Sequence, residues 1–365
     1  MSALLDASLE PGFNTRPEHR PDAAGTATTS AAAPARAPVA PPQRAAAPRW
    51  WALGAVAALA WAALGVLTYA WPNQQVGFSD WAYTAEFAYG TGVVALALLI
   101  LSVGGPLLAG PRERVRPLGP WLIALAVGLA AWELVTAKLA WLPTPFFAPP
   151  QSLAEVYATD WRRLGDSAGN SLILLASGIS SGAAVGFVVG VLIGWSRRAN
   201  YWIHPVLRVL GPIPTTALLP ITFYFFPSSW STAVFLIALG TGFPVAVLTW
   251  SGVASVNRNY YDVARTLGAS NTFLVLRVAI PAALPQVFVG LFMGLGHAFA
   301  TLVVAEMLGV KSGLGWYLTW AQGWASYPNM YGALLVMALL FSGVISLLFA
   351  LRDRLLSWQK GTVKW

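Results

Sequence analysis

Side chains that could do chemistry are few in this sequence, and the most informative of them lies within an apolar segment. Glu306 falls near the end of a long apolar stretch, where burial of a carboxylate is costly enough to indicate a function. Two interpretations stay open. The carboxylate either gates or contacts a permeation path, or it lies at a membrane interface and pairs with Lys311 or a backbone N–H.

A second candidate is the proline-rich segment 211–220, with the sequence GPIPTTALLP. Prolines this dense remove backbone donors and break a helix, which a membrane tolerates only against protein or a water-filled path. We therefore expect Pro214, Thr215 and Thr216 to line a translocation path, in which the two hydroxyls could face an oxyanion. The alternative is ordinary packing of a kinked helix.

The other reactive residue types exclude several classes of enzyme. His204 and His297 are isolated from any second metal ligand at a useful spacing, and no Ser/His/Asp set shares a plausible pocket. The absence of cysteine excludes disulfides and thiol catalysis. The chain also has no G-x-x-x-x-G-K-[ST] phosphate loop. We expect no catalytic residues, cofactor or metal, and any ATP that drives this protein must bind another subunit.

The composition is typical of a membrane protein with several spans. Hydrophobic residues make up 57% of the chain and charged residues only 10%, with 18 Trp and 34 Gly. The net charge of +8 does not indicate nucleic-acid binding, because the cations lie in the first 49 residues and beside the ends of apolar runs. That placement is the one that the positive-inside rule predicts.

Apolar runs long enough to cross a bilayer occur in eight places. They span residues 50–71, 87–109, 119–142, 168–195, 203–226, 231–253, 280–308 and 329–351. The Ala- and Pro-rich segment 1–49 is predicted to be a disordered cytoplasmic tail. Arginines in the connection 110–118, after the fourth run and after the last run place both termini inside. Glu133 and Lys138, in the third run, are expected to pair near the interface.

The segment 257–278 is a polar island between two long apolar runs. Asn257 can cap a short helix, and Gly268 stands where that helix should end, since glycine enters the left-handed region without a Cβ penalty. Ser270 can cap a second helix, and Pro281 falls where the next one would begin. The apolar side of the first helix comprises Tyr261, Ala264 and Leu267. The island is thus predicted to be a helix–turn–helix at a membrane face, exposing an apolar knob.

The island resembles the conserved cytoplasmic loop of the permeases of bacterial ABC importers that work with a binding protein. That loop reads E-A-A, three residues, G, nine residues, I-x-L-P. Its counterparts here are Asp262-Val263-Ala264, Gly268 and Val278-Ala279-Ile280-Pro281. The segments 266–270, 281–285, 304–309 and 312–315 (TLGAS, PAALP, VAEMLG and SGLG) are similar to the nitrate/sulfonate/taurine branch of those permeases. The resemblance covers about residues 119 to 358.

The resemblance implies an all-α, polytopic membrane helical bundle with a type I permease-like core at 119–358 and a coupling loop at 257–278. Residues 50–118 would add two accessory transmembrane helices. The chain would import a small oxyanion such as a sulfonate, taurine or nitrate across the bacterial inner membrane. Expected partners are a cytoplasmic ABC ATPase, a periplasmic or extracellular solute-binding protein and a second permease copy. The residues assigned to ATPase coupling are Asn257, Tyr261, Asp262, Ala264, Arg265, Gly268 and Pro281.

Two other functions remain as alternatives. An ion-coupled secondary transporter would be expected to have paired intramembrane carboxylates or two matched broken helices, whereas only one broken span is clear. A membrane scaffold or sensor would account for the tail and the two extra spans, but not for the polar island. Co-purification of a stoichiometric ATPase would distinguish the importer from both.

Overall fold

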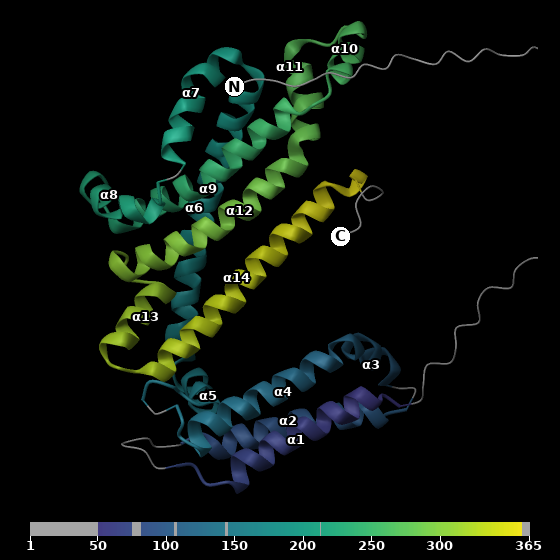
Figure 1. The fold of residues 1–365 in the computed structure, drawn as a ribbon, viewed down its shortest axis with the longest axis vertical. Coiled ribbons are helices and arrows are strands. Elements are labelled where there is room, and N and C mark those ends of the chain that lie inside the picture. Colours follow the sequence, from purple (N-terminus) through teal and green to yellow (C-terminus); the bar gives the residue numbers. More distant parts are fainter. Residues whose placement is uncertain (1–49, 75–81, 106–107, 143–144, 212, 360–365) are drawn as a thin grey trace, which may run out of the picture. The chain divides into compact units, whose positions relative to one another are not determined.

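The computed structural model describes residues 50–74, 82–105, 108–142, 145–211 and 213–359, and all regular structure within them is helical (Figure 1). This confirms the predicted all-α class. The predicted disordered tail, 1–49, lies outside the described residues.

Seven helical segments of the described chain are long and apolar enough to cross a membrane. They are α1 (Ala52–Ala70), α2 (Thr84–Val103), Ala109–Lys138, α6 (Trp161–Trp195), α9 (Ser229–Ala254), Asn271–Leu308 and α14 (Tyr327–Leu355).

Two of these segments are built from several helical elements. The segment Ala109–Lys138 comprises α3 (Ala109–Val115), η2 (Arg116–Leu118), α4 (Gly119–Glu133) and η3 (Leu134–Lys138). The segment Asn271–Leu308 comprises α11 (Asn271–Phe273), η5 (Leu274–Ala279) and α12 (Ile280–Leu308). Shorter helices are α5 (Pro150–Thr159), α10 (Arg258–Thr266), α13 (Leu314–Gly323) and η6 (Ser357–Gln359).

The predicted fifth span is a bent pair of helices rather than one straight crossing. Helix α7 (Arg197–Leu210) is followed by η4 (Thr215–Leu218) and α8 (Leu219–Phe225), and the two halves meet at 87°. The break falls within the proline-rich segment, as the sequence predicts. Counting this pair as one crossing brings the number of candidate spans in the described chain to eight.

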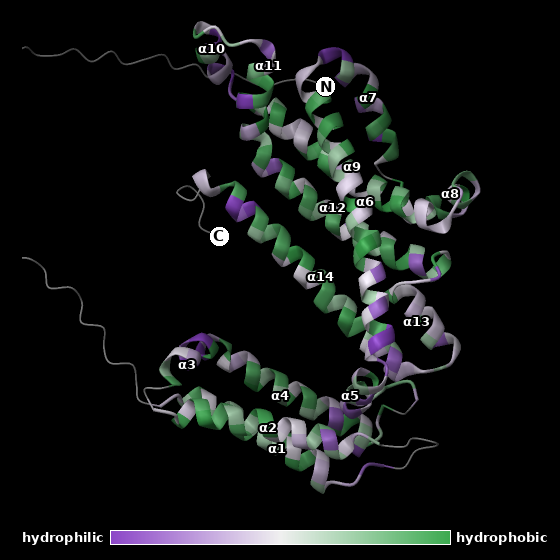
Figure 2. Ribbon diagram, turned by 180° about the vertical axis from the view of Figure 1, so that it is seen from behind, coloured by the Kyte–Doolittle hydropathy of each residue, from purple (hydrophilic) through white to green (hydrophobic). Residues whose placement is uncertain are grey.

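The centre of the bundle is formed by α6, α9 and α12, which pack against one another (Figure 1). Helix α6 approaches α9 through buried glycines at every fourth position: Gly178, Gly182, Gly186 and Gly190. The contact is with main chain, because a Cβ added to Gly182 would lie 2.3 Å from the carbonyl oxygen of Ala238. Figure 2 shows hydrophobic residues along α9, α12 and α14, and hydrophilic residues on α10.

Helices α1, α2 and α4 share a separate apolar cluster that includes Trp51, Leu64, Leu98 and Ala126. The boundary predicted at 118/119 falls within the continuous helical segment Ala109–Lys138, whose α4 part packs on α1. The connection 110–118 is therefore helical, and its arginines lie on α3 and η2.

Glu133 and Lys138 form the predicted pair, with Nζ 3.5 Å from Oε1, and both side chains are fully buried within the protein. The Lys138 ammonium is accommodated there because it donates to three oxygens near the end of α1: Thr68 O at 2.8 Å, Trp71 O at 2.5 Å and Asn73 Oδ1 at 2.6 Å. These bonds tie the end of the third span to α1.

Candidate functional site

The polar island folds as two capped helical segments, as predicted. The Asn257 side chain accepts a hydrogen bond from the backbone N–H of Asn259 at 3.0 Å. At the other end of α10, the Gly268 N–H donates to Arg265 O and the Ala269 N–H donates to Ala264 O, at 2.9 and 3.1 Å. These two bonds form a Schellman motif, which requires its C′ residue in the left-handed region. Gly268 has a φ of +82° and meets that requirement.

The apolar knob of α10 is made of different residues from those predicted. Tyr260, Val263 and Leu267 are 65%, 62% and 83% exposed. Tyr261 and Ala264 are half-buried and face the protein, with the Tyr261 ring 5.7 Å from that of Trp195. Partial burial raises the pKa of the Tyr261 hydroxyl. Of the predicted apolar set, only Leu267 lies on the outer surface.

Asp262 and Arg265 form the expected i,i+3 ion pair on the surface of α10, with 3.6 Å between Oδ1 and Nη1. Both side chains are more than half exposed. Because solvent screens such a pair, it contributes well under ~1 kcal/mol to stability. Both charges are therefore accessible to a partner.

A continuous helical segment joins the island to the membrane. Ser270 accepts from the Phe273 N–H at 3.3 Å and caps α11, as predicted. The helix then passes through the π-helical turn η5 into α12, which has Pro281 in its first turn, as predicted, and is continuous with the segment before it. A wider turn accommodates Pro281, which lacks an N–H and whose ring would clash with the preceding turn of an α-helix. The residues after Ser270 thus form a 38-residue segment that reaches Leu308.

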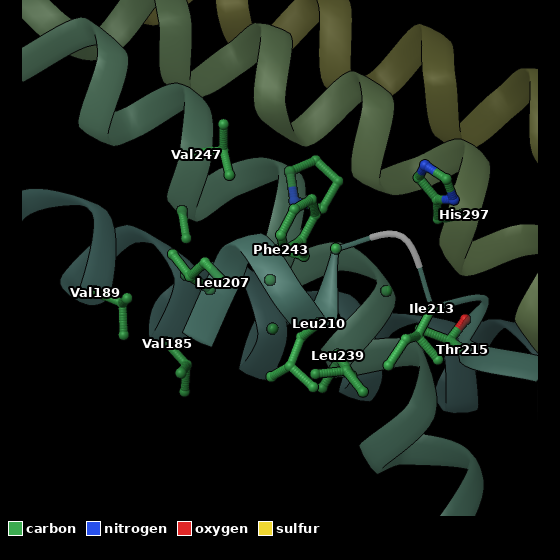
Figure 3. Close-up of a pocket in the computed structure, with 18 of the residues that line it drawn as sticks. Val185, Val189, Leu207, Leu210, Ile213, Thr215, Leu239, Phe243, Val247 and His297 are labelled. Carbon is green, nitrogen blue, oxygen red and sulfur yellow. The ribbon is translucent and has the colours of Figure 1, made fainter. Parts of the chain in front are cut away.

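A cavity of about 680 Å³ lies between α6, α7, η4, α9 and α12 (Figure 3). Of the four residues predicted to line a translocation path or gate, Pro214 and Thr215 line this cavity, whereas Thr216 and Glu306 are not among its lining residues. Most of the wall is aliphatic or aromatic, with Phe243 and Leu210 among the labelled side chains (Figure 3). The proline break therefore borders a cavity, while the other two candidates lie elsewhere.

The hydroxyl of Thr215 is already engaged within the protein. Its Oγ1 lies 2.8 Å from Oγ1 of Thr301, and Thr301 donates its own hydrogen to the carbonyl of His297 at 2.8 Å. A hydroxyl has one hydrogen, so Thr215 must be the donor within the threonine pair. In this arrangement Thr215 offers the cavity only acceptor lone pairs. The expected donation from Thr215 to an oxyanion is therefore not available here.

The structure agrees in part with the second interpretation of Glu306, in which the carboxylate pairs with Lys311 or a backbone N–H. Here the carboxylate accepts a hydrogen bond from a backbone N–H. It is 1% exposed; Oε1 accepts from the Ser171 hydroxyl at 2.7 Å and Oε2 from the Gly315 N–H at 2.8 Å. Ser171 Oγ accepts in turn from the Leu314 N–H at 2.8 Å. The carboxylate thus holds the first turn of α13 onto α6 and α12. Lys311 forms no ion pair with Glu306 in the described chain.

A second polar network, which the sequence analysis missed, anchors α13 through its buried Tyr317. The Tyr317 hydroxyl donates to Asp160 Oδ2 at 2.6 Å and accepts from the Asn329 side chain at 2.7 Å. Burial, followed by the bond to Asp160, raises the pKa of Tyr317 above its ordinary value. Arg163 lies 4.4 Å above the Trp320 ring. Asp160 lies 157 residues before Tyr317, so no local pattern could have indicated this contact.

Replacing Glu306 tests whether hydrogen bonding or charge is needed at this position. Glu306→Ala leaves the Ser171 hydroxyl and the Gly315 N–H buried without acceptors, at a cost of about 1–3 kcal/mol each. Glu306→Gln should retain most of the stability, because its amide oxygen can accept from Gly315 and its NH₂ can donate to Ser171 Oγ. The measurement is the thermal unfolding midpoint of the detergent-purified chain. Equal losses in both variants would show that the charge, and not the hydrogen-bonded clamp, stabilises this region.

Comparisons with known proteins show which family this sequence is similar to. Residues 182–360 match a family described as binding-protein-dependent transport system inner membrane component. The chain is 34% identical over 250 residues to a probable ABC transporter permease protein of Brucella abortus strain 2308, covering 68% of this chain and 99% of that protein. It is 31% identical to the putative aliphatic sulfonates transport permease protein SsuC of Bacillus subtilis, over 52% of this chain and 68% of that protein. It is 29% identical to the nitrate import permease protein NrtB of Synechocystis, over 69% of this chain and 94% of that protein.

Proposed function

Because the chain belongs to the family of binding-protein-dependent transport system inner membrane components, we propose that it is the permease of an ATP-driven importer of a small oxyanion. The chain is a multi-pass membrane transport component rather than an enzyme. ATP would bind and be hydrolysed in a separate cytoplasmic ABC subunit, and a solute-binding protein would deliver the solute from outside. A second copy of the permease would complete the path.

The main support for this proposal is the exposed surface of α10, which has the composition of a docking site for the ATPase. An exposed apolar set, Tyr260, Val263 and Leu267, stands beside the exposed charges of Asp262 and Arg265. Apolar anchors within a charged rim are the composition of a protein-binding surface. The Schellman turn at Gly268 holds this surface at a defined angle to the segment Asn271–Leu308, so that movement of a docked ATPase would be carried into the membrane.

Two observations support an oxyanion as the transported solute. The relatives named above include permeases for aliphatic sulfonates and for nitrate, and both solutes are small oxyanions. The cavity beside Pro214 is mostly apolar and has no Asp or Glu among its described lining residues, so its wall contains no carboxylate that would repel an anion. Sulfonate, taurine and nitrate are the candidate solutes.

Purification of the tagged chain from its native cells tests the assembly. We expect an ATPase subunit to co-purify in stoichiometric amount, and reconstituted vesicles containing the complex and its binding protein to take up nitrate or ethanesulfonate when ATP is supplied. An ion-coupled transporter would instead move solute in the absence of any ATPase. Substituting the three exposed apolar residues of α10 with Ser should remove the ATPase, whereas Tyr201→Ser, at an exposed aromatic residue of α7, should not.

The orientation in the bacterial inner membrane is a further part of the proposal. By the positive-inside rule, the arginines on α3 and η2, at the start of α7 and at the end of α14 support a cytoplasmic position for these regions and for both termini. A reporter that is active only outside the cytoplasm should stay silent when fused after Lys360 and should be active when fused after Ser79. The opposite pattern would contradict this orientation.

A further inference from the structure

We propose that the imidazole of His297 is the group through which the cavity beside Pro214 binds its anion. This inference rests on the proposed function of oxyanion import. His297 has no second metal ligand at a useful spacing in the sequence, but in the structure it lines this cavity.

His297 is exposed within the apolar segment Asn271–Leu308, about midway along α12, and it lines the cavity (Figure 3). A polar ring on an exposed face of a membrane-spanning helix is costly unless it faces water, protein or a solute path. The imidazole forms no side-chain hydrogen bond with any residue that the structure describes. Its N–H groups are therefore available to a ligand.

The hydroxyl groups of the other polar side chains in the cavity wall already donate hydrogen bonds within the protein. Ser181 donates to the carbonyl of Ser177 at 2.7 Å, one helical turn earlier. Thr215 donates to Thr301, as argued above, and Thr301 donates to the His297 carbonyl. Among the described residues that line the cavity, His297 is the only titratable side chain, and none of the rest is charged. It is therefore the donor that an anion in this cavity would meet.

Gly240 on α9 also lines the cavity, close to both Thr215 and His297. A Cβ added to Gly240 would lie 3.5 Å from Oγ1 of Thr215 and 3.6 Å from Cβ of His297, both ordinary van der Waals distances. A methyl group therefore fits at this position, whereas a longer side chain would have to displace its neighbours or extend into the cavity that Thr215 and His297 line.

The chemistry suits a small oxyanion. Imidazole offers one N–H donor when neutral, and two donors with a positive charge when protonated. Hydrogen bonds to a charged partner are strengthened in apolar surroundings, where water does not compete. A single donor set in an otherwise apolar wall would bind an anion without retaining it, which is what passage through the membrane requires.

The test uses the whole complex, as purified with its ATPase and binding protein, reconstituted into vesicles. Initial uptake of nitrate and of ethanesulfonate is measured at saturating ATP. His297→Ala should lower uptake about tenfold or more, the loss expected for one hydrogen bond to a charged group. His297→Gln retains an N–H donor and should lose less. The matched control is His204→Ala, which removes an imidazole that packs on Trp250 outside the cavity and should transport as wild type does.

A second pair of variants tests the space beside the imidazole without altering the donor. Gly240→Ala should transport nearly as wild type does, and Gly240→Leu should lose most uptake. The amount of ATPase that co-purifies with each variant reports whether the complex has assembled.

The results separate the two proposals. Uptake of neither solute by the wild-type complex would overturn the function as an importer of these oxyanions, and the role of His297 with it. Uptake by wild type that is equalled by His297→Ala would overturn only the role of His297.

Discussion

Replacing Gly268 with valine should produce a permease that inserts and folds but no longer couples ATP hydrolysis to uptake. A Cβ at Gly268 would meet nothing within 4 Å, so the substitution creates no clash with the rest of the protein. The cost arises from the backbone, since φ is +82° and a β-branched residue is a genuine outlier in that region. A left-handed conformation costs an ordinary L-residue roughly 1–2 kcal/mol, and the Schellman turn would rearrange to avoid it. The angle between α10 and the segment Asn271–Leu308 would then change.

ATP hydrolysis and solute uptake in reconstituted vesicles measure this effect. In Gly268→Val, we expect the ATPase either to fail to bind or to hydrolyse ATP without uptake. Gly268→Asn should be milder, because Asn enters the left-handed region more readily. Gly343→Val on α14 is the matched control, since it also meets open space but does not have a positive φ. Normal coupling in Gly268→Val would rule out this loop as the coupling element.

Replacing Gly182 with valine should have a different and more general effect, the loss of a folded permease. An added Cβ would lie 2.3 Å from the carbonyl oxygen of Ala238 and 2.8 Å from its Cα. These are main-chain atoms of α9 and cannot rotate away, so the two helices must separate. Overpacking in a core typically costs 1–3 kcal/mol, and we expect at least about that here, because the separation would also disturb the contacts of Gly178 and Gly186.

The expected readouts are a large fall in membrane-inserted, monodisperse protein and a lower unfolding temperature of whatever is recovered. Gly165→Val is the matched control on the same helix, since an added Cβ there meets nothing within 4 Å and the residue is exposed. It should accumulate as wild type does. If Gly182→Val accumulated equally well, close contact between α6 and α9 would not be required for folding.

The contrast between the two glycines shows what local sequence can indicate. Gly268 was identified from its place after a capped amphipathic helix, because the Schellman turn is a local structure. The four-residue spacing of Gly178, Gly182, Gly186 and Gly190 is also visible in the sequence and is a known packing pattern of membrane helices. It identifies a contact face, but not the helix that packs there. That partner, α9, was decided by tertiary structure.

The sequence by itself determined the helical class, the apolar segments, the break near Pro214 and the capped island with its end at Gly268. These features depend on composition, periodicity and backbone chemistry within a few residues. Packing decided that Tyr260 rather than Tyr261 points outward, because the ring contact with Trp195 turns Tyr261 inward.

The tertiary structure alone decided which polar groups remain available. Ser171 lies 135 residues before Glu306, and Thr215 lies 86 residues before Thr301. Each of these contacts fixes a hydrogen-bond donor or acceptor that the sequence leaves open. A polar side chain can act on a ligand only with the hydrogens and lone pairs that the fold has not used. That physical constraint removes Thr215 as a donor, makes Glu306 part of a clamp on α13, and leaves the imidazole of His297 without a hydrogen-bond partner among the described residues.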